Sequence, residues 1–378
     1  MLRRQHSTQT FIIKTSKETE LKKTLAIILA LGAATAQAQT SVNIYGIVDA
    51  GLVHESGGAA GSVNKLTSGV GAASRIGFRG THDLGGGSSV LFTLENGHRI
   101  DTGEVDAAGT IFNRQAFVGI KGKAGMLTLG RQYTPWHQAL AQVGDPFTTG
   151  YAGGSKNVFP DFGTNVRTSN TVMYTTPVIN GFTADVAYSA GEQIDSSKSG
   201  RQMGASLAYA KGPLNVRLAY SHKNSDIAAA PGVTPLRRGN GSNKLLVANY
   251  DFKLVKAYFA FSVDKGFGSA PLGNNSNPFG GVAPTASTDG NEVLLGAVVP
   301  AGPGNIVATL MRKDDKRAVN QDARSVGLGY LYALSKRTTL YTVYGAIDNE
   351  NGAGYTVANN TESGSGDRAF NLGVRHSF

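Results

Sequence analysis

The sequence of 378 residues contains no cysteine and, beyond residue 38, no long apolar run. The lack of cysteine excludes disulfide bonds, thiolate metal sites and a cysteine nucleophile. The lack of long apolar runs argues against transmembrane helices, since a helix needs about 20 mostly apolar residues to span a bilayer. The cellular compartment must therefore be inferred from other features of the chain.

The N-terminus has the pattern of an export signal. Lys22 and Lys23 precede an apolar run over residues 24–32, and small residues follow it up to Ala38. A charged region, an apolar region and an A-x-A site in this order predict cleavage after Ala38. We therefore assign residues 1–38 to an N-terminal extension and signal peptide, and residues 39–378 to a single exported domain.

The exported domain carries a small excess of positive charge. The chain has 36 basic and 26 acidic residues, of which six and two lie within residues 1–38, so the remainder has a formal charge of +6. The basic residues are spread without long runs, which argues against nucleic acid as a partner. In an exported protein such an excess favours anionic solutes.

Short alternating segments make up most of the exported domain. In Ser74–Gly80, two arginines lie on one face and two apolar residues on the other, and residues 370–378 alternate similarly. A period of two residues predicts β-strands.

The breaks between these segments alternate strictly between two kinds. Seven are short and eight are long and polar, so fifteen connections join sixteen strands. An up-and-down transmembrane barrel has this organisation, and lipid requires the sheet to close. A soluble propeller or sandwich is the alternative, but it predicts no such alternation. The short breaks are 83–89, 122–125, 178–181, 211–213, 252–254, 300–304 and 334–336, and the long ones are 54–73, 98–112, 133–166, 191–202, 223–243, 264–291, 314–323 and 348–367.

Five arginines are predicted to face the inside of this barrel. Arg75 and Arg79 lie opposite the apolar face of their strand, so they line the lumen if that face meets lipid. Arg114, Arg131 and Arg167 lie at the ends of neighbouring strands and extend the same wall. A row of arginines in an aqueous pore concentrates anions, because low-dielectric walls focus the electric field.

The third long loop, residues 133–166, is the longest, and loops of this length are usually functional. We expect it to fold inward and narrow the lumen, with an extended surface loop as the alternative. Its charged residues Asp145, Lys156 and Asp161 then lie across from the arginines. Acids on one side and arginines on the other predict an electric field across the pore at its constriction.

No pattern in the chain predicts catalysis, a cofactor or a metal. The seven histidines show no H-x-x-x-H or H-E-x-x-H spacing, and there is no G-x-S-x-G motif. We therefore expect the protein not to be an enzyme. An outer-membrane hydrolase on a smaller barrel is the rival from the enzyme class, and it needs a Ser/His pair facing lipid.

Six segments match a known family in order and spacing. They are Ser41–Gly51, Ser74–Gly87, Asn113–Gly119, Gly130–Tyr133, Arg167–Tyr174 and Gly373–Phe378. In these segments the chain resembles the trimeric general porins of Gram-negative bacteria, especially the anion-preferring branch typical of beta-proteobacteria. The resemblance implies an all-β fold, a 16-stranded antiparallel transmembrane β-barrel with an inward-folded third loop. It also implies a homotrimer in contact with outer-membrane lipid and lipopolysaccharide.

The resemblance assigns roles to single residues. Arg75, Arg114 and Arg167 fall at positions of the arginine row that faces the constriction loop in this family, and Arg79 and Arg131 are adjacent candidates.

Two further features of the family concern the C-terminus and the third loop. Phe378 matches the terminal aromatic residue that the barrel-insertion machinery reads. Many relatives carry a Pro-Glu-Phe-Gly-Gly-like stretch in the third loop, and the nearest segments here are Pro160–Gly163 and Asp145–Thr148. Which acid faces the arginines therefore stays open.

The sequence thus predicts an outer-membrane porin for passive diffusion of small hydrophilic solutes, anionic or neutral, with a preference for anions. A substrate-specific outer-membrane channel is the alternative, which saturable conductance would distinguish. Long loops that act as an adhesin or phage receptor are compatible with either function.

Overall fold

The computed structural model describes residues 41–274, 277–281 and 283–378, and the strands in it form one continuous antiparallel sheet. The expected extension and signal peptide, with cleavage after Ala38, lie outside the described residues. In chain order the strands are β1 (Ser41–Gly58), β2 (Gly61–Ser68), β3 (Arg75–Gly85), β4 (Ser88–Gly97), β5 (Gln115–Gly122), β6 (Gly125–Tyr133), β7 (Arg167–Thr175), β8 (Phe182–Ser189), β9 (Gln202–Lys211), β10 (Leu214–Asn224), β11 (Asn240–Asp251), β12 (Lys256–Ala270), β13 (Ser287–Ala301), β14 (Gly304–Asp315), β15 (Ala323–Ala333), β16 (Thr338–Asn349) and β17 (Arg368–Ser377).

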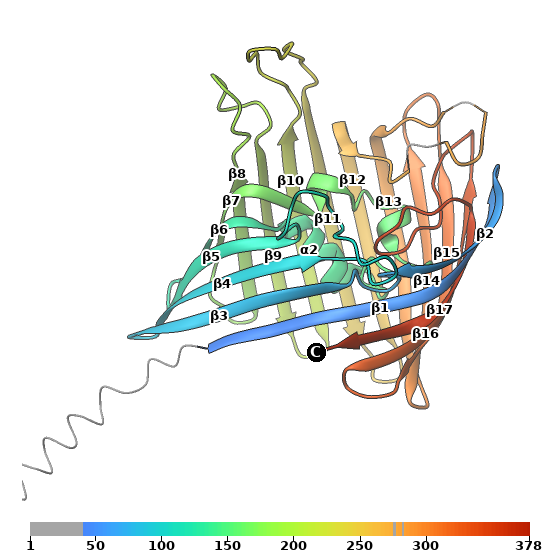
Figure 1. The fold of residues 1–378 in the computed structure, drawn as a ribbon, viewed down its shortest axis with the longest axis horizontal. Coiled ribbons are helices and arrows are strands. Elements are labelled where there is room, and N and C mark those ends of the chain that lie inside the picture. Colours follow the sequence, from blue (N-terminus) through green and yellow to red (C-terminus); the bar gives the residue numbers. More distant parts are fainter. Residues whose placement is uncertain (1–40, 275–276, 282) are drawn as a thin grey trace, which may run out of the picture.

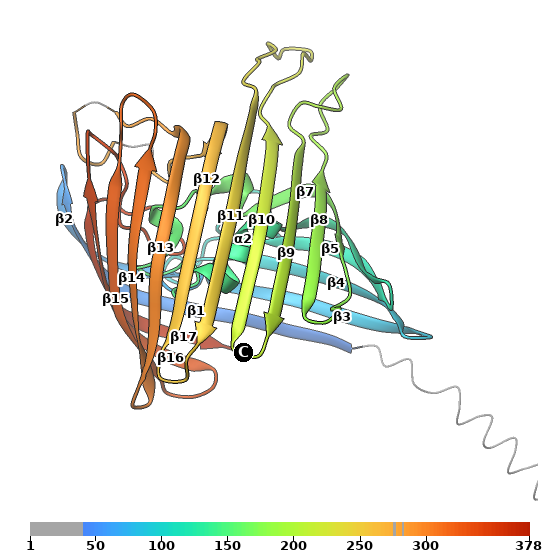
Figure 2. The same ribbon diagram turned by 180° about the vertical axis from the view of Figure 1, so that it is seen from behind.

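The sheet closes into a barrel because its first and last strands pair (Figure 1 and, from behind, Figure 2). β1 and β17 pair over ten residues of each strand. Gly46 and Phe378 continue this pairing with two backbone hydrogen bonds, each 3.1 Å between N and O. Closure gives β1 and β17 a neighbour on both sides, as a sheet surrounded by lipid requires.

The seventeen labelled strands occupy sixteen positions in the barrel. β2 pairs with residues 50–58 of β1, and β3 pairs with residues 41–47 of the same strand. β2 and β3 are therefore two halves of one barrel strand, interrupted at residues 69–74. The predicted sixteen-stranded antiparallel barrel is confirmed.

The first outer connection differs from the sequence prediction. The sequence predicts a loop over residues 54–73, but β1 continues to Gly58 and β2 covers Gly61–Ser68. Polar pairs across this hairpin explain the difference: Nζ of Lys65 lies 2.8 Å from Oε1 of Glu55. Such cross-strand pairs stabilise strands without an apolar face, so alternating hydropathy does not reveal them.

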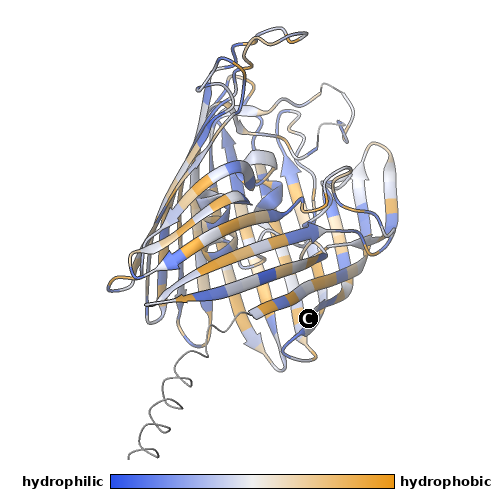
Figure 3. Cartoon of the chain, turned by 60° about the vertical axis from the view of Figure 1, so that its left-hand side comes forward, coloured by the Kyte–Doolittle hydropathy of each residue, from blue (hydrophilic) through white to orange (hydrophobic). Residues whose placement is uncertain are grey.

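Hydrophobic and hydrophilic residues alternate along many of the strands (Figure 3), and successive side chains of a strand point to opposite faces of the sheet. In β15, Ser325 is buried on the inner face, whereas Val326 and Leu328 on the outer face are 45% and 57% exposed. Exposed apolar side chains are unfavourable in water and favourable in lipid. The outer face therefore forms the lipid-facing band of a transmembrane barrel.

The third loop packs against the inner face of the barrel. Its first part forms a short helix, α2 (Pro135–Ala139), and a π-helical turn, η1 (Leu140–Gly144), and α2 lies within the ring of strands in Figure 1. Trp136 and Leu140 are fully buried against inward-facing residues of β10–β14, such as Leu245. Two 3-10 turns follow, η2 (Ser155–Asn157) and η3 (Gly163–Asn165). No helix among the described residues is long and apolar enough to cross a membrane.

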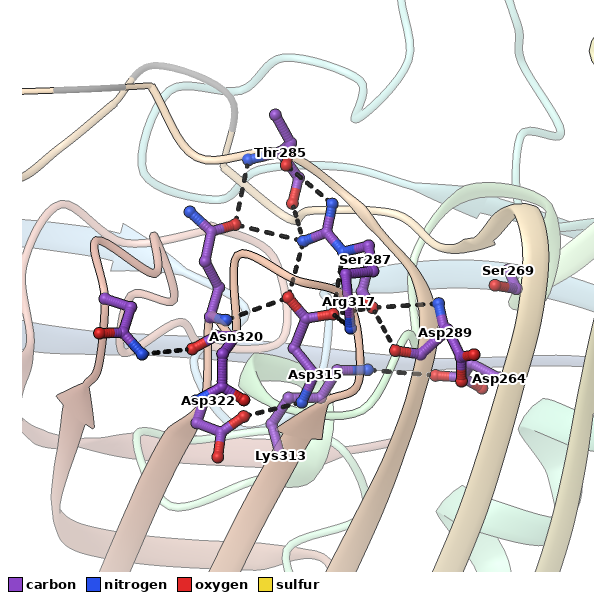
Figure 4. Close-up of polar contacts among 12 residues, drawn as sticks. Asp264, Ser269, Thr285, Ser287, Asp289, Lys313, Asp315, Arg317, Asn320 and Asp322 are labelled. Carbon is purple, nitrogen blue, oxygen red and sulfur yellow. Dashed lines mark hydrogen bonds and ion pairs between the residues drawn. The ribbon is translucent and has the colours of Figure 1, made fainter.

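Buried charges connect strands β12–β14 on the inside of the barrel. Lys313 is 1% exposed, and its ammonium group contacts the carboxylates of Glu292 and Asp264. Near the outer ends of these strands, Asp315 accepts hydrogen bonds of 2.9 Å from Arg317 and 2.8 Å from Ser287 (Figure 4). Pairing is what makes the burial of these charges tolerable.

Candidate functional site

A cavity of about 890 Å³ lies between the third loop and one wall of the barrel. Seven basic side chains line it, but only two acidic ones, Asp106 and Asp161. The basic residues are Arg75, Arg99, Arg114, Arg131, Lys156, Arg167 and Arg375. We call Arg75, Arg114, Arg131 and Arg167, which lie in or next to β3 and β5–β7, the arginine wall.

A buried carboxylate holds two members of the arginine wall. Oε1 of Glu95 accepts a hydrogen bond of 2.8 Å from Nε of Arg114 and lies 3.9 Å from Nη1 of Arg75. The hydroxyl of Tyr45 donates to Oε2 of Glu95 over 2.9 Å. Because one carboxylate serves two guanidinium groups, this cluster keeps a net positive charge beside the cavity.

Tyr133, the last residue of β6, connects two members of the wall. Its hydroxyl oxygen accepts hydrogen bonds from Nη2 of Arg114 at 2.6 Å and from Nη2 of Arg167 at 3.2 Å. The Arg167 guanidinium also lies 4.7 Å from the centre of the Tyr133 ring, within range of a cation–π contact. The His137 ring stacks on Tyr133 with 4.9 Å between ring centres.

Arg131 is fixed by neutral partners. Its Nε donates to the carbonyl of Asn113 at 2.7 Å, and its Nη1 donates to Oγ of Ser169 at 3.0 Å. In the part of the chain that the structure describes, no carboxylate forms an ion pair with Arg131 or Arg167. Their charges are therefore available to a solute in the cavity.

Lys156 brings a positive charge to the cavity from the opposite side. Its Nζ donates a hydrogen bond of 2.6 Å to the carbonyl of Asn360, and it lies 5.3 Å from the centre of the Phe162 ring. Burial, together with the nearby charges of Arg167 and Arg114, lowers the pKa of Lys156 to about 8.

Asp161 is the third-loop acid that lines the cavity. Its Oδ1 lies 2.6 Å from Nδ1 of His137, whose backbone N–H is held by Oγ1 of Thr134 at the start of α2. Burial alone would raise the pKa of Asp161, but His137 and Lys156 outweigh it and hold that pKa below its usual value. Asp161 therefore remains a carboxylate at neutral pH.

The other third-loop acid, Asp145, lies away from the cavity. It is 1% exposed and accepts backbone hydrogen bonds of 2.7–2.9 Å from Phe147, Thr149 and Ser155. A carboxylate with three such partners closes a turn of its own chain, as the side chains of Asp often do. The structure thus gives Asp145 a role inside the loop, where the sequence predicts a place facing the arginines.

Two more predicted residues lie outside the cavity. Arg79 is exposed on β3, and its guanidinium lies 5.0 Å from the centre of the Tyr45 ring. Phe378 is at the seam of the barrel, where its backbone pairs with Gly46 and its side chain is 44% exposed.

Sequence reasoning missed several residues of the site. Arg375 lies on the polar face of the last strand and had the same signal as Arg75, namely alternation with apolar neighbours. Glu95, Arg99 and Asn360 had no such signal, because their roles depend on contacts between distant segments: Arg99 and Asn360 line the cavity, and Glu95 holds two of the arginines beside it.

A closed transmembrane barrel with a charged cavity inside is the architecture of a membrane channel. A family profile described as Gram-negative porin matches residues 24–352, and the chain therefore belongs to this family. Its function is that of an outer-membrane channel for the passive diffusion of hydrophilic solutes.

Individual proteins agree with this assignment. An outer membrane porin protein of Bordetella pertussis is 32% identical, over 95% of this chain and 100% of its own. Outer membrane porin protein 32 of Delftia acidovorans is 30% identical, over 94% and 98% of the two chains. The solved structure of an anion-selective porin from Comamonas acidovorans has a TM-score of 0.71 at 26% identity, and the match covers 90% of this chain and 100% of that one.

Proposed function

We propose that this porin prefers anions, and that selection occurs between the arginine wall and the third loop. The observation that carries the proposal is the excess of seven basic over two acidic side chains around one cavity. Charges held in a narrow, low-dielectric passage raise the local concentration of ions of opposite sign. The anion selectivity of the similar Comamonas protein supports the same reading.

Planar-bilayer recording tests this proposal. Under a salt gradient, the purified wild-type protein is expected to give a reversal potential whose sign shows a higher permeability for anions than for cations. Arg131→Gln and Arg167→Gln should each reduce this potential without leaving a carboxylate unpaired, since both arginines have neutral partners. Arg79→Gln is the matched control outside the cavity and should have a smaller effect.

Three outcomes decide the matter. A wild-type reversal potential that shows a higher permeability for cations would overturn the proposal. Equal changes of the reversal potential in all three variants would also overturn it. Conductance that saturates with one solute would favour the alternative, a substrate-specific channel.

A proposal on the assembly of the channel follows from its membership of the Gram-negative porin family. We infer a homotrimer in outer-membrane lipid and lipopolysaccharide, exported by a signal peptide that is cleaved after Ala38 and inserted by machinery that reads Phe378. The exposure of the Phe378 side chain at the barrel seam is compatible with this last role. Cross-linking of the purified protein should give a three-subunit product, and Phe378→Ala should reduce the amount of assembled barrel.

A further inference from the structure

The last loop, residues 350–367 between β16 and β17, reaches the cavity through Asn360 and Thr361. The side chain of Asn360 forms a hydrogen bond with each side of the cavity. Its Oδ1 accepts from the backbone N–H of Ala73 at 2.9 Å, in the interruption between β2 and β3. Its Nδ2 donates to the carbonyl of Thr149 in the third loop at 3.3 Å. One amide therefore bridges the barrel wall and the third loop.

The backbone N–H of Asn360 shares an acceptor with the third loop. It donates to the carbonyl of Val70 at 3.1 Å, and the same carbonyl accepts the N–H of Tyr151 from the third loop at 2.8 Å. The two sides approach so closely here that a Cβ on Gly150 would lie 2.0 Å from the carbonyl oxygen of Gly71. The edge of the cavity is thus a junction of three segments distant in sequence.

Asn360 also determines where one of the cavity charges lies. Its carbonyl accepts the hydrogen bond from Nζ of Lys156, which fixes the ammonium group at the third-loop side of the cavity. The four polar groups of Asn360 therefore have partners on both sides of the cavity, including one of its seven basic residues.

We infer that Asn360 is a positioning residue that sets the width of the constriction and the position of Lys156. The inference rests on the proposed function, because width and charge matter only if solutes pass between the wall and the third loop. Without the amide bridge, the third loop and the β2–β3 interruption keep the direct bond from Tyr151 to Val70 but lose the side-chain link through Asn360, and the gap beside it widens. A wider gap raises conductance and weakens the field that each fixed charge exerts on a passing ion.

The test compares two variants of Asn360 with a control in the same loop. Asn360→Ala removes both side-chain bonds and should raise single-channel conductance and lower the anion-to-cation permeability ratio. Asn360→Asp keeps an acceptor for Ala73, loses the donor to Thr149 and adds a negative charge. It should lower the permeability ratio further than alanine does, and it provides the same test should the alanine variant not fold.

The control is Thr356→Val, because Oγ1 of Thr356 donates a hydrogen bond to the carbonyl of Ser363 within the last loop and Thr356 does not line the cavity. It should conduct like the wild type. The pH dependence of the permeability ratio is a second readout, and its midpoint should move in both Asn360 variants but not in Thr356→Val, because only the Asn360 variants change the environment of Lys156.

Wild-type conductance and selectivity in both Asn360 variants would overturn the inference. Equal changes in Thr356→Val would also overturn it, since general loosening of the loop would then be the cause. A wild-type channel without anion preference would contradict the proposed function instead, and the conductance comparison would still decide whether Asn360 sets the width.

Discussion

The hydroxyl of Tyr341 donates a hydrogen bond of 2.8 Å to Oδ1 of Asp49, although the two residues are 292 positions apart. Oδ2 of the same carboxylate accepts the backbone N–H groups of Gly71 at 3.0 Å and Ala72 at 2.8 Å. Gly71 and Ala72 belong to the interruption between β2 and β3, and both line the cavity. A contact between β1 and β16 thus supports the chain segment at the edge of the cavity.

Substitutions of Asp49 and Tyr341 should lower stability to different extents. Tyr341→Phe removes one hydrogen bond and should cost about 1 kcal/mol, whereas Asp49→Ala should cost more because the N–H groups of Gly71 and Ala72 and the Tyr341 hydroxyl all lose their partner. Asp49→Ala should also alter conductance, since the cavity edge loses its support. Heat-induced mobility shifts on gels measure the stability, and Tyr344→Phe, on the lipid-facing side, is the control. Equal destabilisation by Tyr344→Phe would contradict this prediction.

Anion preference should fall as the pH rises from 7 to 9. Lys156 is positively charged below its pKa of about 8 and neutral above it, so the cavity loses one positive charge over this range. Lys156→Arg keeps the charge at all these pH values and should remove the part of the pH dependence that is due to Lys156. Reversal potentials measured at several pH values check this, and an unchanged pH profile in Lys156→Arg would exclude Lys156 as the titrating group.

Asp161 and Asp145 should respond differently to neutralisation. Asp161→Asn removes one of the two acids that line the cavity, so anion preference should increase. Asp145→Asn should lower thermal stability without this increase, because Asp145 accepts hydrogen bonds from backbone N–H groups of its own loop and does not line the cavity. Bilayer recordings of both variants decide which acid faces the arginines, and a gain in anion preference for Asp145→Asn would reverse the assignment.

Removal of the buried ammonium group of Lys313 should destabilise the barrel strongly. Lys313→Met leaves the carboxylates of Glu292 and Asp264 buried without their partner, a change that typically costs about 3–5 kcal/mol. Addition of Glu292→Gln should recover part of the loss, since one buried charge is then removed. Thermal unfolding of the single and double variants provides the measurement, and a double variant less stable than Lys313→Met would speak against this account.

Much of the barrel could be predicted from the sequence because its signals are local. The turn between β9 and β10 contains Gly212 and Pro213, and Gly212 adopts a φ of +58°, which a tight reversal requires and glycine provides. The inward position of Arg75 follows from alternation within one strand, and Arg375 could have been found in the same way.

The remaining parts of the site depend on contacts that no local pattern encodes. Asn360 meets Ala73 across 287 positions, and neither segment has a regular period from which that contact could be read. Glu95 is an ordinary acidic residue in a strand until the barrel places Arg75 and Arg114 beside it. From the sequence, Asp145 and Asp161 are equally good candidates for the acid that faces the arginines. Only the path of the third loop shows that Asp161 lines the cavity and Asp145 does not.

The pairing of Gly46 with Phe378 has a consequence for biosynthesis. Until the final strand has been translocated, β1 lacks its neighbour and the growing sheet keeps two hydrogen-bonding edges that attract other strands. The nascent chain must therefore be shielded in the periplasm until its last residues arrive. A product truncated before β17 would retain these open edges and become a target for aggregation or degradation.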